Sequence, residues 1–289
     1  MKGIIIDDDR GLNYESNSPV RKMANMFFNP VLRMLPSGSI EVLKKTHPSA
    51  QVIVDHATTY KAMEVLYNRT PRADTNRFQN FFLSIWLGTN NSKAVRNRLR
   101  LVKREIRNKI LELASENREI NILNIASGSS RAVLESSEEL GDNVKLSAVF
   151  IDKDHEAISF SQQLAKGHKY NSSFRWFNDS ADVFLNTRGL LMRFNIVEIV
   201  GLLEYLNDED AVALFSKAYS KLDPDGILVT ANIIKNVERR FIHEVVGWKM
   251  RYRSADELSS LLISAGFNLD KMKIFYEPQR VHCVIVAQK

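Results

Sequence analysis

The sequence predicts an α/β fold with a mostly parallel sheet behind a helical N-terminal region. From about residue 90 onward, short apolar runs alternate with amphipathic helical patterns, which is typical of βαβ units. Only residues 277–280 separate the last two runs, and so short a connection can only join an antiparallel pair. We therefore expect a parallel sheet that ends in a hairpin.

The seven apolar runs are the expected strands, and helical patterns lie between most of them. The expected strands are Ile120–Ala126, Leu146–Ile151, Ser173–Phe177, Phe194–Val200, Ile227–Ile233, Lys273–Tyr276 and Val281–Ala287. The expected helices lie near residues 130–140, 154–166, 180–188, 208–222 and 254–265.

Residues 1–90 form the expected helical N-terminal region, and residues 91–289 the expected α/β domain. Apolar residues at helical spacing predict one helix over residues 51–68 and a second from Asn76 to Leu87, which Gly88 ends.

The composition narrows the protein's class. No apolar run approaches the ~20 residues of a membrane span, and acids directly follow the short apolar start, so we expect no signal peptide and a cytoplasmic protein. The single cysteine, Cys283, lies in an apolar run, so we expect a buried side chain and no internal disulfide. No Cys/His cluster suggests a metal site.

The positive charge is concentrated in one helix. The net charge is +6, and residues 96–109 hold much of the excess. Leu99, Val102, Ile106 and Ile110 recur at helical spacing, which predicts an amphipathic helix with a basic outer face. That face is either solvated or a docking surface for an anionic substrate or RNA.

A turn of small residues follows the first expected strand. Small side chains there let a ligand lie against the backbone, where a Cβ would collide with it. This turn resembles motif I of class I S-adenosylmethionine-dependent methyltransferases. Ala126, Gly128 and Ser130 occupy the usual glycine positions, with Ser127 between them, whereas Asn124 stands where an acid is common.

The second expected strand leads into Asp152, Lys153 and Asp154, and Asp152 comes 24 residues after Gly128. A carboxylate at the end of this strand matches a vicinal diol, because its two oxygens accept from two hydroxyls. We expect Asp152 to bind the ribose of the cofactor, with Lys153 beside it, and Asp154 to cap the next helix.

The loop after the third strand holds a candidate adenine site. In the methyltransferases that the chain resembles, a polar residue of this loop meets the adenine edge and an apolar one covers its face. Asp179 is the candidate acceptor, with Phe177 or Asn178 beside it. A capped helix start at Asp179 or Ser180 explains the same pattern.

The fourth strand ends at Gly201 and Leu202, which correspond to motif IV beside the reacting methyl group. The next expected helix ends at Leu222-Asp223-Pro224-Asp225-Gly226, a turn that is frequent in these enzymes. Pro224 is expected to stop the helix, and Gly226 to supply the turn.

The resemblance implies a Rossmann-like seven-stranded methyltransferase sheet of order 3-2-1-4-5-7-6 with the last strand antiparallel, and S-adenosyl-L-methionine as cofactor. Residues 201–206 and 246–258 are similar to bacterial enzymes that methylate the carboxyl group of 3-hydroxy fatty acids. The resemblance to methyltransferases also implies that residues 1–90 cover the acceptor site as a lid, and that the acceptor is a small molecule.

The acceptor decides which side chains take part in the reaction. A carboxylate needs a cation or donors to orient it, and Arg251, Tyr252 or Arg253 could do this. A hydroxyl or amine needs a base, for which His243 is the candidate. Tyr205 could line the acceptor site or pack in the core.

Three other functions fit parts of the pattern. The basic helix would suit an RNA methyltransferase. The altered motif I leaves room for an enzyme that transfers the aminocarboxypropyl group, as nicotianamine synthases do. A binding module without catalytic activity would also tolerate the lost glycines.

Overall fold

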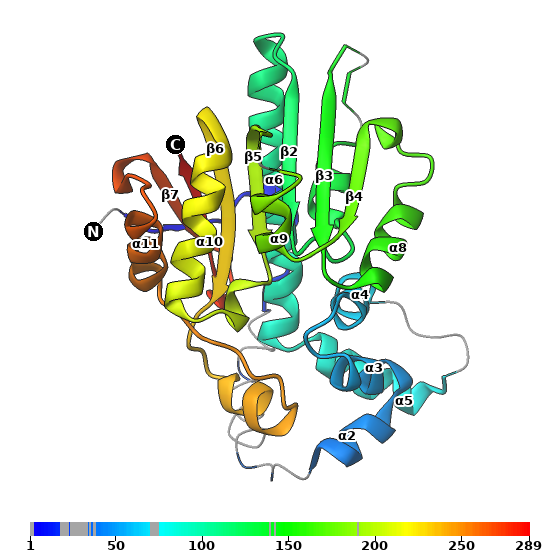
Figure 1. Ribbon diagram of the computed structural model, residues 1–289. Coiled ribbons are helices and arrows are strands. Elements are labelled where there is room, and N and C mark those ends of the chain that lie inside the picture. Colours follow the sequence, from blue (N-terminus) through cyan, green and yellow to red (C-terminus); the bar gives the residue numbers. More distant parts are fainter. Residues whose placement is uncertain are drawn as a thin grey trace.

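An eight-stranded sheet forms the centre of the computed structural model (Figure 1). The structure describes residues 3–17, 39–69, 75–138, 140–141, 143–189 and 191–289, with residues 23, 34 and 36. The strands are β1 (Ile5–Ile6), β2 (Ile120–Ile125), β3 (Leu146–Asp152), β4 (Phe174–Asn178), β5 (Phe194–Val200), β6 (Leu222–Ile233), β7 (Met272–Tyr276) and β8 (His282–Gln288).

The strand order is β1-β7-β8-β6-β5-β2-β3-β4. Seven of these strands follow the expected order, and β8 runs antiparallel to both β6 and β7 as expected. The expected count of seven is wrong, because β1 adds a parallel edge strand beside β7. Two residues are too few to show a period of two, so the sequence pattern missed this strand.

Helices cover both faces of the sheet and bury two large apolar clusters against it. One face is covered by α9 (Ala181–Asn186), α10 (Asp208–Lys221) and α11 (Ala255–Ser264). The other face is covered by α6 (Asn90–Ser115) and α7 (Arg131–Ser136). Helix α8 (His155–Leu164) contacts β3 and β4. Strands such as β5 are apolar almost throughout because both of their faces are covered. Cys283 lies in this core as expected, and burial raises its pKa to about 12.

The N-terminal helices are α2 (Ile40–Thr46), α3 (Pro48–Asp55), α4 (Tyr60–Asn68) and α5 (Arg77–Leu87). The second expected helix is confirmed, with Asn76 closing a capping box. The single helix expected over residues 51–68 is wrong, because a turn at residues 56–59 divides it into α3 and α4. Both parts keep the apolar period, so periodicity alone could not show the break.

The basic outer face of α6 is expected to be either solvated or a docking surface, but several of its basic side chains are buried. Arg96, Arg98 and Lys109 are each 5% exposed or less. Lys103 pairs with Glu135, while Arg104 binds Asp7, Asp9 and Glu105. Much of the positive charge of α6 is therefore neutralised within the protein.

The turn expected at residues 222–226 lies within β6, where the pairing with β5 shifts register between Phe194 and Ile196. The left-handed residue is Asp225, at φ 64°, and not Gly226. A Cβ on Gly226 would lie 3.0 Å from the carbonyl oxygen of Asp223 and 3.2 Å from that of Asn195. Glycine is needed here for close packing of backbones.

Among the residues that the structure describes, no helix is long and apolar enough to cross a membrane.

Candidate active site

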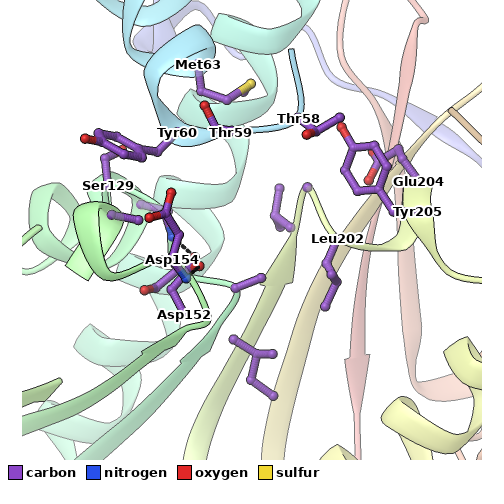
Figure 2. Close-up of a pocket in the computed structure, with 18 of the residues that line it drawn as sticks. Thr58, Thr59, Tyr60, Met63, Ser129, Asp152, Asp154, Leu202, Glu204 and Tyr205 are labelled. Carbon is purple, nitrogen blue, oxygen red and sulfur yellow. Dashed lines mark hydrogen bonds between the residues drawn. The ribbon is translucent and has the colours of Figure 1, made fainter. Parts of the chain in front are cut away.

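A cavity of about 920 Å³ opens at the carboxyl ends of β2, β3 and β5. Its wall combines the turn after β2, the loops after β3 and β5, the N-terminal half of α6, and helices α3 and α4. Figure 2 shows Thr58, Thr59, Tyr60 and Met63 on one side, facing Asp152 and Leu202 at the strand ends. Carboxyl ends of parallel strands are where open α/β sheets bind ligands.

The turn after β2 has a left-handed backbone at all three positions expected to match glycines. The φ angles are 53° at Ala126, 52° at Gly128 and 57° at Ser130. Alanine and serine are strained there by on the order of 1–2 kcal/mol each. The backbone shape of a glycine-rich turn is therefore kept although two of its glycines are absent. Ser127 lines the same cavity, and its buried hydroxyl has no hydrogen-bond partner.

Asp152 joins the two loops that line the polar end of the cavity. Its Oδ2 accepts from the Gly128 amide at 2.8 Å, and its Oδ1 accepts from the Asp154 amide at 2.9 Å. Each carboxylate oxygen can accept a further hydrogen bond. Lys153 also lines the cavity. Asp154 caps α8 by accepting from the Glu156 amide, as expected.

The loop after β4 brings only part of the expected adenine site to the cavity. Asp179 lines it, with a side chain 23% exposed and 3.9 Å from Arg188. Asn178 donates its side-chain amide to the Asp152 carbonyl and is not among the lining residues. Phe177 packs on Phe184 with 4.9 Å between ring centroids. Ser180, and not Asp179, caps α9.

Of the five candidate residues for the reaction, the structure brings only Tyr205 to the cavity. Gly201, at φ 87°, and Leu202 line the wall beside it. The Tyr205 hydroxyl accepts a hydrogen bond of 2.7 Å from the Trp248 indole. Burial raises the pKa of Tyr205 to about 12, so its phenol stays protonated at neutral pH.

The other four candidates lie outside the cavity wall. Arg251 is exposed, and His243 is half-buried on the short π-helix Phe241–Val245. The ring of Tyr252 packs under the guanidinium of Arg239, 5.0 Å from its centroid. Arg253 is buried away from the cavity, where it binds Asp208 and three other oxygen acceptors.

A buried polar cluster in the wall escaped the sequence analysis. Its members line one side of the cavity near the face that α6 covers: Arg98, Asn124, Glu198, Glu204 and His282. Burial raises the pKa of Glu198 to about 8 and also raises that of Glu204, although Arg98 opposes both shifts. Burial also keeps the pKa of His282 well below its usual value. Asn124, Glu198 and His282 lie on the buried strands β2, β5 and β8. A polar residue in a buried apolar strand was the signal in the sequence that could have located them.

The opposite end of the cavity is apolar. Helices α3, α4 and α5 and the segment 242–250 line it with Ile53, Met63, Leu66, Trp86, Ile242, Val246, Trp248 and Met250. Helix α4 is tied to the α/β domain beside the polar end. Tyr60 packs on Phe160 at 5.1 Å, Lys61 pairs with Glu156 at 2.8 Å, and Glu64 pairs with Arg131 at 2.7 Å.

One family model covers most of the chain. The family model described as "Putative methyltransferase" matches residues 47–289. The chain belongs to this family, and the expectation of a methyltransferase is confirmed at that level. No curated protein matches the sequence.

Solved structures share the fold at low sequence identity. A possible exported protein from Bordetella parapertussis superposes with a TM-score of 0.66 at 15% identity, covering 95% of this chain and 99% of the other. The S-adenosylmethionine-dependent methyltransferase SibL gives 0.54 at 14%, covering 94% and 77%. Magnesium protoporphyrin IX methyltransferase from Synechocystis with bound S-adenosylmethionine gives 0.50 at 12%, covering 68% and 83%.

Proposed function

We propose that the protein transfers a methyl group from S-adenosylmethionine to a small-molecule acceptor. The observation that carries this proposal is a single cavity with a polar end at the strand termini and an apolar end among the N-terminal helices. A cofactor and an acceptor that share one enclosed space can be held in contact while water is kept out. We further propose that residues 1–90 act as the lid of this space.

The polar end fits the cofactor. Asp152 accepts the ribose hydroxyls, because both of its oxygens keep acceptor capacity at the cavity wall. The turn from Ala126 to Ser130 lies against the cofactor with its left-handed backbone. Asp179 meets the adenine edge, while Gly201 and Leu202 flank the reacting end.

The apolar end fits an acceptor with a hydrophobic body. The bound cofactor supplies an electrophilic methyl group, so the protein's task is to align the acceptor and exclude water. An acyl chain of a 3-hydroxy fatty acid would suit this lining. A carboxylate held by Arg251 or Arg253 receives no support, since neither side chain lines the cavity.

The basic helix α6 gives less support to an RNA substrate than its sequence suggests. The basic residues Lys103, Arg104 and Arg96 of α6 bind acidic partners within the chain. A free basic surface is what backbone phosphates require, so we favour the small-molecule acceptor.

The by-product tests the reaction type. The purified protein is incubated with S-adenosylmethionine and a small-molecule extract, and nucleoside products are separated. Methyl transfer yields S-adenosylhomocysteine, whereas aminocarboxypropyl transfer yields methylthioadenosine. Accumulation of methylthioadenosine, or of neither product above a no-protein control, contradicts the proposal.

Filling the apolar end should separate acceptor binding from cofactor binding. Val246 is 3% exposed and lines this end, so we expect Val246→Phe to reduce turnover about tenfold or more by occupying acceptor space. Its affinity for S-adenosylhomocysteine, measured calorimetrically, should stay within about twofold of wild type. An unchanged turnover would exclude this end as the acceptor site.

A further inference from the structure

Among the residues that the structure describes, three arginines are almost completely buried, at 4% exposure each, and only one of these three faces the cavity. Arg96 is fully engaged by the Glu15 carboxylate and by the carbonyl oxygens of Leu66 and Leu87. Arg253 is likewise engaged by Asp208 and by three further acceptors. Arg98, in contrast, has a buried Nε without a hydrogen-bond partner.

The protein's own groups satisfy Arg98 poorly. Its contact with the Glu204 carboxylate is 3.7 Å long, beyond hydrogen-bond distance, and it also interacts with the Tyr67 hydroxyl of α4. A buried guanidinium that lacks a close anion is costly to desolvate. Its planar fork matches a carboxylate, which could bind through two parallel hydrogen bonds.

Unpaired acceptors lie in the same wall. The Asn124 Oδ1 and the Glu204 Oε2 are buried and have no hydrogen-bond partner. Asn124 and Glu198 are register neighbours on β2 and β5, so their side chains share one face of the sheet. Asn124 also lies two residues before Ala126, where the left-handed turn begins. The wall thus offers a cationic donor and uncompensated acceptors within one cluster.

We propose that Arg98, Asn124 and Glu204 bind a zwitterionic α-amino-acid group, the methionyl end of the cofactor. Arg98 receives the carboxylate, while Asn124 and Glu204 receive the ammonium. This assignment rests on the proposed function, because it presupposes that the cavity binds S-adenosylmethionine. Tyr67 is a positioning residue that links the N-terminal helices to this end of the ligand.

The test combines a variant of the protein with a variant of the ligand. Calorimetry measures the affinity of wild type and Arg98→Met for S-adenosylhomocysteine and for its decarboxylated analogue, which keeps the ammonium. We expect Arg98→Met to lose about 10- to 100-fold in affinity for S-adenosylhomocysteine and less than about threefold for the analogue. Arg98→Lys keeps the charge but not the planar fork, so its affinity for S-adenosylhomocysteine should fall between those of wild type and Arg98→Met.

Several outcomes overturn the assignment. Equal losses for both ligands, or no loss for either, would show that Arg98 does not bind the carboxylate. If Arg98→Met does not fold, equal affinity of the wild type for both ligands would still contradict the proposal. A wild type that binds the decarboxylated analogue more weakly than S-adenosylhomocysteine supports the proposal. A wild type that binds neither ligand would instead refute the proposed cofactor itself.

Discussion

Asp152→Ala should weaken the binding of S-adenosylhomocysteine about 10- to 100-fold. The side chain would no longer accept from the ribose hydroxyls, and buried hydrogen bonds to a charged group contribute about 1.5–3 kcal/mol. It would also no longer accept from the amides of Gly128 and Asp154, which hold the two loops together. Isothermal titration calorimetry of the purified protein measures this loss directly.

Two variants separate the ribose contact from loop geometry. Asp152→Asn keeps a neutral oxygen acceptor for one backbone amide, so it should retain more of the affinity than alanine does. Asp154→Ala removes the cap of α8, which costs about 1 kcal/mol of stability, and should leave the affinity nearly unchanged. Wild-type affinity in Asp152→Ala would mean that the ribose assignment is wrong.

Glu198→Gln should stabilise the ligand-free protein more above pH 8 than at pH 5. The difference between its effects on the free energy of unfolding at these two pH values should be on the order of 2–4 kcal/mol. Burial raises the pKa of Glu198 to about 8, from 4.5 when exposed. Between these values the folded protein retains a proton that the unfolded chain releases. Stability therefore falls as pH rises from about 4.5 to about 8, and glutamine removes this fall.

Denaturant unfolding of both proteins at pH 5, 7 and 9 measures the effect. Burial also raises the pKa of Glu204, but Glu204 is present in both proteins. The difference in free energy of unfolding between the two proteins therefore isolates Glu198. The exposed Glu209 provides a matched control, and Glu209→Gln should run parallel to wild type. Parallel curves for Glu198→Gln as well would contradict a neutral, buried Glu198.

The sequence predicted the parallel sheet and its antiparallel end because strand runs and connection lengths carry local signals. It also located Gly128, Asp152 and Gly201, which lie where strands end and turns begin. The two-residue strand β1 and the turn that separates α3 from α4 left no signal in apolar periodicity.

The buried polar cluster depended on contacts between distant segments. Arg98 resembles other basic residues of its helix, and only the fold shows that it faces a cavity while Arg96 binds Glu15. The positions of the catalytic candidates depend on the same kind of contact. Arg251 and Tyr252 come directly after Met250, which lines the cavity, but neither of their side chains lines it.

The most direct test of the central claim follows the methyl group itself. The protein is incubated with S-adenosylmethionine labelled on the methyl group and a fractionated bacterial extract, and label is counted in the small-molecule and RNA fractions. Methyl transfer to a small acceptor predicts label in the small-molecule fraction, and its release by mild base would identify a methyl ester. Label confined to RNA would contradict the account.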